Sequence, residues 1–264
     1  SEQIHRMGMK FGLWFEPEMV SEDSDLYRAH PDWALTIPGR EPNRGRNQLV
    51  LNMARPDVRD YLLERLTDIL SNAKIDYVKW DMNRSICDIF SSCSGTERTG
   101  ELYHRYVLGV YELLEGFLAR FPHILLEGCS GGGGRFDAAM LYYSPQIWCS
   151  DNTDAVNRLS IQYGTSFFYP VSAVGAHVSA CPNHQTGRSV PFRTRGDVAM
   201  AGSFGYELDL NQITDEEKEQ VREQINSFRY LYSLTHEGDY YRLTEPGKDD
   251  FMAWEFVDEN RDHA

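Results

Sequence analysis

The stretch Ile75-Asp76-Tyr77-Val78-Lys79-Trp80-Asp81-Met82-Asn83 decides how this chain is interpreted. Its first part is an apolar run that predicts a buried strand. Its second part places a cation, a carboxylate and an amide where that strand ends. An Asp81 kept ionised by Lys79 and Asn83 suits a nucleophile better than a general acid. The alternative is a strand-end aspartate that caps the next turn, and this segment alone does not separate the two.

Strand-like and helix-like segments alternate on both sides of this stretch. Further strands are predicted at residues 10–15, 48–52, 124–127, 146–149, 170–178 and 205–210. Pro56 stands in the first turn of one predicted helix, and Thr214-x-x-Glu217 opens another that continues to about His236. The apolar faces of two predicted helices consist of Val58, Tyr61, Leu62, Leu66, Ile69 and Leu70, and of Leu102, Tyr106, Val110, Leu113, Leu114 and Phe117.

Repeated βα units with short turns predict a parallel sheet with helices outside it. Polar and glycine-rich residues follow the strand ends, where a (β/α)8 TIM barrel carries its chemistry. An open doubly wound sheet is the alternative, but no early Gly-x-Gly-x-x-Gly follows the first strand. We predict an incomplete α/β barrel with about six of eight strands over residues 1–245, its N-terminal strands missing. Residues 246–264 are predicted to start a C-terminal β domain.

Composition excludes several classes of partner. The 264 residues carry a net charge of −14, which argues against a nucleic-acid or anionic membrane partner. No apolar run approaches the roughly 20 residues that span a bilayer. The polar start shows no signal-peptide core. Five cysteines, an odd number without Cys-x-x-Cys spacing, predict reduced thiols in a cytoplasm. We expect neither a metal site nor a cofactor.

Asp81 and Asp151 are the two carboxylates that the pattern favours as a pair. Each ends an apolar strand and is followed by polar residues. Two carboxylates at the carboxyl-terminal rim of a barrel are the minimal apparatus for cleaving a glycosidic bond. Glu16, Glu18 and Glu127 are the competing acids of this rim.

A glycine run at 128–134 follows the strand at 124–127 and lets the backbone approach a flat ligand such as a sugar ring. Phosphate is disfavoured because Arg135 stands where a P-loop has Lys-Ser/Thr. Trp14, at a strand end, fits stacking on a pyranose face, although a lone tryptophan is more often part of a core. Arg46 is a candidate for bonding sugar hydroxyls or pairing with an acid.

Several blocks together resemble the catalytic domain of the glycoside hydrolase family 36 α-galactosidases. They run in family order from about residue 8 to about residue 240. They are Gly12-Leu13-Trp14-Phe15-Glu16-Pro17-Glu18-Met19-Val20, Lys79-Trp80-Asp81-Met82-Asn83-Arg84, Leu126-Glu127-Gly128-Cys129-Ser130-Gly131-Gly132-Gly133, Trp148-Cys149-Ser150-Asp151-Asn152-Thr153-Asp154-Ala155, Gly175-Ala176-His177-Val178-Ser179 and Gly205-Tyr206-Glu207-Leu208-Asp209.

The resemblance implies a retaining mechanism that releases terminal α-D-galactose from melibiose- and raffinose-type oligosaccharides. Asp81 would be the nucleophile and Asp151 the acid/base, with Asp154 as the close alternative. The two carboxyl groups should then lie roughly 5–6 Å apart. The resemblance further implies a homotetramer, and it implies that the sugar is bound by Trp14, Arg46, Lys79, Asn83, Cys129 and Gly132.

Three other functions are kept as alternatives. Relatives similar to raffinose and stachyose synthases transfer galactose to a sugar acceptor, and an α-N-acetylgalactosaminidase differs in the room beside C2 of the sugar. A non-catalytic sugar-binding fragment is an alternative of another class. A barrel that lacks strands exposes sheet edges, so we expect residues 1–264 alone to be weakly active or inactive. Normal turnover of p-nitrophenyl α-galactoside by this chain would contradict that expectation.

Overall fold

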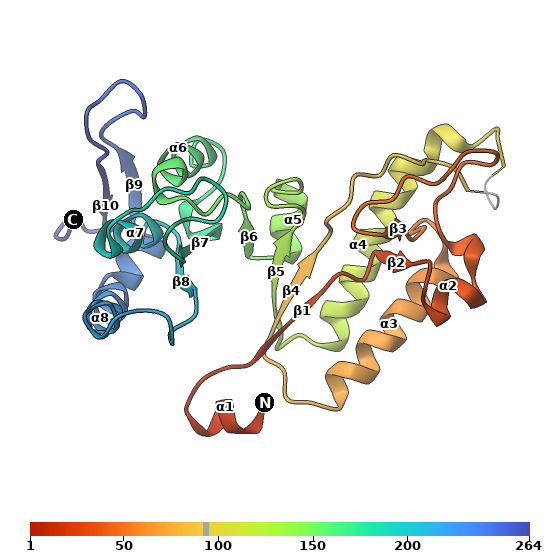
Figure 1. Ribbon diagram of the computed structural model, residues 1–264, viewed down its shortest axis with the longest axis horizontal. Coiled ribbons are helices and arrows are strands. Elements are labelled where there is room, and N and C mark those ends of the chain that lie inside the picture. The colour runs from red at the N-terminus through yellow and green to blue at the C-terminus, as the bar shows by residue number, and fades with distance from the viewer. Residues whose placement is uncertain (92–94) are drawn as a thin grey trace. The chain divides into compact units, whose positions relative to one another are not determined.

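The computed structural model describes residues 1–91 and 95–264. The chain divides into two compact units, which are described separately (Figure 1). The first comprises Ser1–Gly131 with Tyr142–Ser144, and the second comprises Gly132–Leu141 with Pro145–Ala264. Helix α5 (Ala138–Tyr143) contributes residues to both. One of the five cysteines, Cys93, lies outside the described residues.

Three parallel strands form the sheet of the first unit, in the order β1 (Gly12–Phe15), β4 (Tyr77–Asp81) and β5 (Leu125–Cys129). The stretch at residues 75–83 contains β4, the middle strand of the three. Its register places Asp81 beside Cys129, the last residue of β5. Because the strands run in one direction, their carboxyl ends lie at one edge of this sheet.

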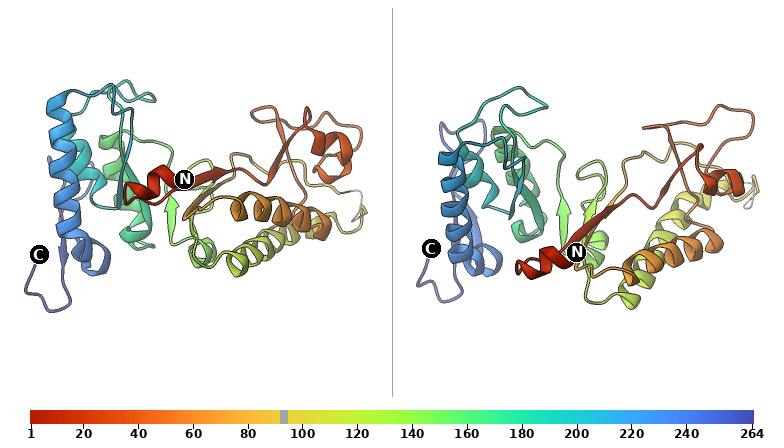
Figure 2. Two further views of the ribbon diagram at one scale, coloured as in Figure 1. Left: turned by 90° about the horizontal axis from the view of Figure 1, so that it is seen from below. Right: turned by 60° about the horizontal axis from the view of Figure 1, so that its bottom comes forward.

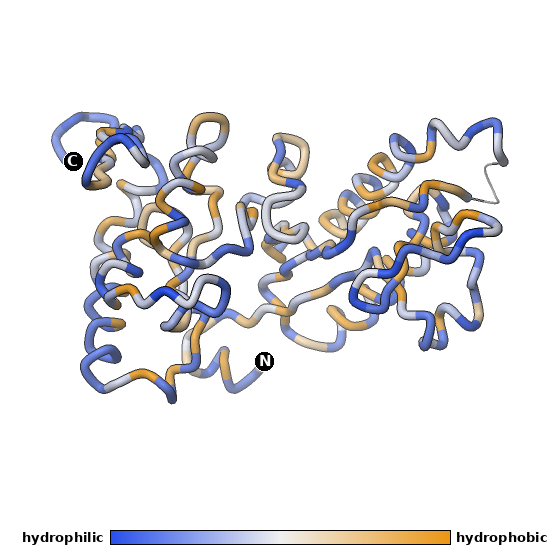
Figure 3. Tube along the Cα trace, turned by 45° about the horizontal axis from the view of Figure 1, so that its top comes forward, coloured by the Kyte–Doolittle hydropathy of each residue, from blue (hydrophilic) through white to orange (hydrophobic). Residues whose placement is uncertain are grey.

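Helices α3 (Pro56–Ser71) and α4 (Leu102–Arg120) lie side by side in this unit (Figure 1). Hydrophobic and hydrophilic residues alternate along both, as the tube of Figure 3 shows. Proline at the start of α3 suits a position whose N–H needs no partner. All six residues of the predicted α4 face are buried, whereas on α3 the buried stripe is Val58, Leu62, Leu66 and Leu70. Ile69 is exposed because it lies about 100° around the helix from Leu70, so its placement on the apolar face was wrong.

The predicted strand at 48–52 does form, as β3 (Gln48–Val50), but it is not part of the parallel sheet. It pairs antiparallel with β2 (Met19–Ser21) in a separate two-stranded sheet. Helix α3 follows it, so the local pattern imitated a βα unit of the barrel. The other elements of the first unit are α1 (Glu2–Arg6), α2 (Asp25–Ala29) and the 3-10 turns η1 (Pro31–Trp33) and η2 (Thr99–Glu101).

The second unit repeats the βα pattern with three further parallel strands, β6 (Gln146–Trp148), β7 (Val174–Ser179) and β8 (Ser203–Glu207). Helices α6 (Ala155–Thr165) and α7 (Phe192–Ala199) follow β6 and β7. The start of the predicted strand at 170–178 forms a 3-10 turn instead, η3 (Val171–Ala173). Side chains from β7, α7 and β8 form the core, with Ala176, Val178 and Phe192 packed against Phe204 and Tyr206.

The long helix α8 (Asp215–Glu237) begins at the predicted capping box (Figure 2). The Thr214 hydroxyl accepts the N–H of Glu217 at 3.1 Å, and the Glu217 carboxylate accepts the N–H of Thr214 at 3.0 Å. These reciprocal bonds satisfy two N–H groups that a helix start leaves unpaired. The capping box confirms the predicted start of this helix. Its last residue, Glu237, agrees with the end predicted at about His236.

After α8, β9 (Asp239–Arg242) and β10 (Trp254–Val257) form an antiparallel pair. This pair joins residues on both sides of the boundary predicted after residue 245, and that boundary stays a prediction. Among the described residues, no helix combines the length and apolar character needed to cross a membrane.

Candidate active site

The first unit gathers several predicted site residues at the carboxyl ends of its strands. Trp14 of β1 pairs in register with Lys79 of β4, and Asp81 pairs with Cys129 of β5. Residues that the sequence places more than 100 positions apart therefore meet at one sheet edge. This is the edge at which βα enzymes carry their chemistry.

Asp81 is held by one of its two carboxylate oxygens. Its Oδ2 accepts hydrogen bonds from Trp14 Nε1 at 3.2 Å and from Asn83 Nδ2 at 2.7 Å. Its Oδ1 is buried and accepts no hydrogen bond from the residues that the structure describes. A buried acceptor without a donor costs free energy, so fold stability does not explain this atom. The two donors fix the carboxylate and leave Oδ1 as its uncommitted oxygen.

Glu16, which follows β1, connects Arg46 to this aspartate. Its Oε1 lies 2.8 Å from Arg46 Nη1 and also accepts a hydrogen bond from Asn83. Asn83 therefore donates to two carboxylates, Glu16 and Asp81. The sequence pattern indicates Glu16 only as a competing acid of the rim and gives no sign of this connection. Because its carboxylate is bound by a guanidinium and an amide, Glu16 is suited to orient Arg46 and Asn83.

A tight turn presents Arg46. Gly45 and Gln48 exchange two backbone hydrogen bonds around Arg46 and Asn47, whose φ angles are 55° and 59°. Two central residues with positive φ are typical of a type I′ turn, which favours glycine and asparagine. An arginine there is strained, and such strain tends to occur at functional sites.

Lys79, which is half-buried, forms an ion pair with the buried Glu127. The Lys79 Nζ lies 3.2 Å from Glu127 Oε1, and the Tyr77 hydroxyl donates to Glu127 Oε2. Burial, reinforced by the charge of Glu127, raises the pKa of Tyr77, so its hydroxyl stays protonated and donates. Tyr77, Lys79 and Asp81 are spaced two apart and so lie on one face of β4. Glu127 Oε1 accepts no hydrogen bond from the described residues but is charge-paired with Lys79, and Oε2 accepts from Tyr77. This pairing makes Glu127 a partner of Lys79 and a poor candidate for the second catalytic acid.

Glu18 is excluded from the site by its place in the core. It is 0% exposed, and its oxygens accept from Trp80 Nε1 at 3.0 Å and from the Tyr106 hydroxyl at 2.6 Å. A buried carboxylate needs such donors to offset its lost hydration. Glu18 therefore joins β4 and α4 from within.

In the second unit, the structure separates the two candidate acids that follow β6. Asp154 is 1% exposed and caps α6, since its Oδ1 accepts from the N–H groups of Val156 and Asn157. Arg188 binds the same oxygen at 2.6 Å, and Thr186 binds the other at 2.5 Å.

Burial acts to raise the pKa of Asp154. The hydrogen bonds from Thr186, from the N–H of Asn157 and from Arg188 outweigh burial and hold that pKa below its usual value. A carboxyl that holds its proton so weakly is a poor general acid. Asp151 lies three residues earlier, is exposed, and carries none of these capping bonds.

The glycine run packs against the backbone of the strand that leads to Asp151. A Cβ on Gly132 would lie 2.6 Å from the backbone nitrogen of Asp151, and one on Gly133 would lie 2.3 Å from the Cys149 carbonyl oxygen. Gly132 also has a φ of 82°, which side chains other than glycine rarely adopt. Close backbone packing therefore explains why both positions are glycine, whether or not a sugar binds there.

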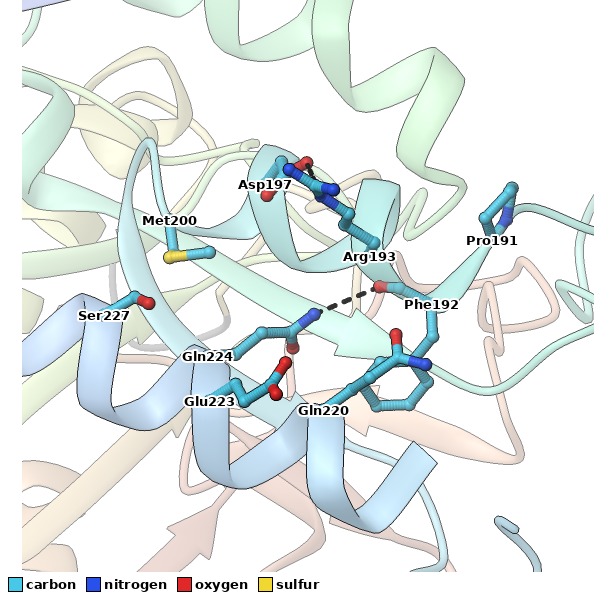
Figure 4. Close-up of a pocket in the computed structure, with 9 residues that line it drawn as sticks. All are labelled: Pro191, Phe192, Arg193, Asp197, Met200, Gln220, Glu223, Gln224 and Ser227. Atoms are coloured by element: carbon cyan, nitrogen blue, oxygen red, sulfur yellow. Dashed lines mark hydrogen bonds and ion pairs between the residues drawn. The ribbon is translucent and has the colours of Figure 1, made fainter. Parts of the chain in front are cut away.

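A metal centre and a ligand pocket are two other kinds of site that the described residues could provide. Among the described residues, no group of three histidine, cysteine or acidic side chains is arranged to hold a metal ion. A pocket of about 600 Å³ lies between α7 and α8, with Phe192, Gln220 and Gln224 in its lining (Figure 4). None of the predicted site residues lines it.

Comparison with known proteins connects this site to a family. The Melibiase family matches residues 1–238 of the chain. A bifunctional α-galactosidase/sucrose kinase of Mediterraneibacter gnavus is 60% identical over 262 residues, which are 99% of this chain and 27% of that protein. The α-galactosidase AgaA of Geobacillus stearothermophilus is 54% identical over 264 residues, 100% of this chain and 36% of that protein. The chain thus spans about a third of the length of these relatives.

Solved structures agree with these matches. The crystal structure of AgaA, a family 36 α-galactosidase, covers 98% of this chain with a TM-score of 0.96, and the chain covers 36% of it. Two further structures of AgaA, with the same TM-score, are complexes with raffinose and with stachyose. Beside a shared substitution, the raffinose complex replaces one aspartate by asparagine and the stachyose complex replaces another by alanine. The likeness confirms the predicted α/β barrel class, with six of its strands present, and the resemblance to family 36.

Proposed function

The chain belongs to the melibiase family, and from that premise we propose that it carries the catalytic site of a retaining α-galactosidase. Its substrates would be oligosaccharides with a terminal α-galactose, of the melibiose and raffinose type. The observation that carries the proposal is the Asp81 carboxylate, held by Trp14 and Asn83 through Oδ2 while Oδ1 is uncommitted.

In the first step, Oδ1 of Asp81 attacks C1 of the galactose as the bond from C1 to the leaving oxygen breaks. Asp151 gives its proton to that oxygen, so the leaving group departs as a neutral alcohol. In the second step, Asp151 takes a proton from water, and the water oxygen attacks C1. The bond between C1 and Asp81 then breaks, and the sugar leaves with its original α configuration.

Asp151 is favoured over Asp154 on two grounds. Asp154 is committed to capping α6 and to Arg188, whereas Asp151 is exposed at the strand end. In addition, the aspartates replaced in the two AgaA complexes are as far apart in that chain's numbering as Asp81 and Asp151 are here. The carboxyl separation of roughly 5–6 Å that a retaining pair requires stays a prediction.

Six residues are proposed to hold the galactose. Trp14 would stack on the ring, and Lys79 would bind a hydroxyl while Glu127 holds its ammonium group. Arg46 and Asn83, oriented by Glu16, would bind further hydroxyls. Cys129, beside Asp81 in the register, and Gly132 would line the sugar site.

The cysteines bear on the cellular setting. None of the four cysteines that the structure describes, Cys87, Cys129, Cys149 and Cys181, forms a disulfide. This supports a reducing compartment, and we propose a cytoplasmic location. A homo-oligomer, a tetramer as the family resemblance implies, is proposed for the full-length protein.

The stereochemistry of the first product tests the mechanism. Proton NMR of the full-length protein acting on p-nitrophenyl α-galactoside should show α-galactose before mutarotation supplies the β anomer. Initial release of β-galactose would contradict the double displacement. No release from this substrate, from raffinose or from melibiose would contradict the proposed function itself.

A further inference from the structure

Arg158 of α6 is a buried cation that the proposed chemistry does not use. It is 3% exposed, and no carboxylate among the described residues pairs with it. Its guanidinium makes three hydrogen bonds instead. Nε donates to Gln162 Oε1 and Nη1 to the Ser150 carbonyl, both at 3.1 Å, and Nη2 donates to the Gly175 carbonyl.

A guanidinium in this position is costly unless its surroundings compensate for the lost water. The compensation here comes from the two backbone carbonyls, from Gln162 Oε1 and from the face of Trp148, 4.8 Å from the guanidinium carbon. Burial lowers the pKa of Arg158, but an arginine starts so high that the group stays charged. The guanidinium thus connects the end of β6 to β7 by directional bonds that an apolar side chain would not make.

The bond to Ser150 acts on the peptide group that precedes Asp151. That peptide is planar, so fixing its carbonyl also fixes the N–H and the Cα of Asp151 at its other end. Gly132 packs against the same peptide. A Cβ placed on this glycine would lie 2.6 Å from the nitrogen of Asp151. On the far side of Asp151, the N–H of Asn152 donates to Ser150 Oγ at 3.1 Å, and Asn152 Oδ1 accepts the N–H of Asp154 at 3.0 Å.

We propose that Arg158 is a positioning residue for Asp151, because its fork of donors fixes the Ser150 carbonyl and thereby the direction in which the Asp151 side chain leaves the backbone. This inference rests on the proposed role of Asp151 as acid/base. A lysine keeps the charge but lacks the planar fork, so it would not restore the geometry.

The same unit contains a matched control. Arg195 of α7 is 7% exposed, donates to the carbonyls of Ser179 and Val190, and lies 4.7 Å from the ring of Phe192. Like Arg158, it is buried and contacts backbone carbonyls and an aromatic ring. Unlike Arg158, it also pairs with Glu217 at 3.5 Å and does not bind the peptide of Asp151. Arg195→Lys should therefore destabilise the fold without acting on the acid.

Leaving-group dependence separates positioning from general damage. Raffinose has a poor leaving group that needs the proton of Asp151, whereas 2,4-dinitrophenyl α-galactoside releases a phenolate that hardly needs it. The ratio of kcat/KM for the two substrates does not depend on the fraction of folded enzyme. In the full-length protein, Arg158→Lys and Arg158→Gln should both lower kcat/KM for raffinose at least about tenfold more than for the aryl substrate.

The Arg158 variants are compared with wild type, with Asp151→Asn and with Arg195→Lys. Asp151→Asn should shift the ratio of kcat/KM for the two substrates in the same sense by about a hundredfold or more, and Arg195→Lys should leave that ratio at the wild-type value. A wild-type ratio in both Arg158 variants would overturn the positioning role while Asp151→Asn still supports the proposed function. A shift confined to Arg158→Gln would assign the effect to charge and also overturn it. A wild-type protein that hydrolyses neither substrate would overturn both proposals.

Discussion

Replacing Asp154 by alanine should unfold the protein more easily while leaving the chemistry in place. The substitution removes the oxygen that caps α6 through the N–H groups of Val156 and Asn157. It also leaves Thr186 and Arg188 without the carboxylate that they bind. By contrast, Asp151→Ala removes an exposed side chain and should mainly affect catalysis.

The magnitude follows from these bonds. Loss of an N-cap costs about 1–2 kcal/mol. The hydroxyl of Thr186 adds about 1 kcal/mol, and the bond to Arg188, discounted because that side chain is 42% exposed, adds less than about 1 kcal/mol. The free energy of unfolding should therefore fall by about 3 kcal/mol, which lowers Tm by about 6–12 °C for a domain of this size. Asp154→Asn, whose amide can still cap, should lose less.

Urea denaturation at several pH values, with kcat/KM measured alongside, checks this prediction. Because the folded-state pKa of Asp154 is depressed, its charge contributes stability that is fully present above the unfolded pKa, about 3.9, and is lost as pH falls through the folded pKa. The stability gap between wild type and Asp154→Asn should accordingly narrow below about pH 4. A gap of less than about 1 kcal/mol for Asp154→Ala at pH 7, or a loss of kcat/KM as large as that of Asp151→Ala, would refute the reasoning.

Three further variants test other parts of the site in the full-length protein. Gly132→Ala would place a Cβ 2.6 Å from the Asp151 nitrogen at a residue with a positive φ. Thermal denaturation should show that the free energy of unfolding falls by about 1–3 kcal/mol, and kcat/KM should fall as well. Unchanged kinetics would contradict the close packing. Glu127→Gln removes the charge that holds Lys79, so calorimetry should show galactose binding weakened about tenfold, and equal affinity would speak against the pairing. Tyr106→Phe leaves a buried oxygen of Glu18 with one donor fewer, which should cost about 1–3 kcal/mol in urea unfolding without changing kcat; a loss of kcat would contradict a purely structural Glu18.

The helices could be predicted from sequence because their signals are local. Pro56 begins α3, the capping box of Thr214 and Glu217 begins α8, and the apolar spacing of α4 repeats every three or four residues. The strand β3 shows what local signals cannot predict. Its own residues identify it as a strand, but its antiparallel partner β2 lies 27 or more residues earlier, and no local pattern indicates which strand it pairs with.

The candidate site likewise contains some residues whose placement the sequence could predict and others whose roles it could not. Trp14, Asp81 and Asn83 could be predicted to lie together because strand ends of a parallel sheet share one edge. The roles of Glu16, Tyr77 and Arg158 could not, because each depends on a side-chain contact with a segment elsewhere in the chain. Alternation along β4 was the one signal that placed Tyr77 beside Lys79.

The role of Asp81 is tested most directly by replacing it with alanine and supplying azide. The full-length Asp81→Ala variant would be given 2,4-dinitrophenyl α-galactoside with and without azide, and the configuration of the product would be read by proton NMR. With the nucleophile removed, azide should restore turnover by attacking from the face that Asp81 occupied, and the product should be β-galactosyl azide. Formation of α-galactosyl azide, or turnover that is as fast as wild type without azide, would contradict the assignment of Asp81 as the nucleophile.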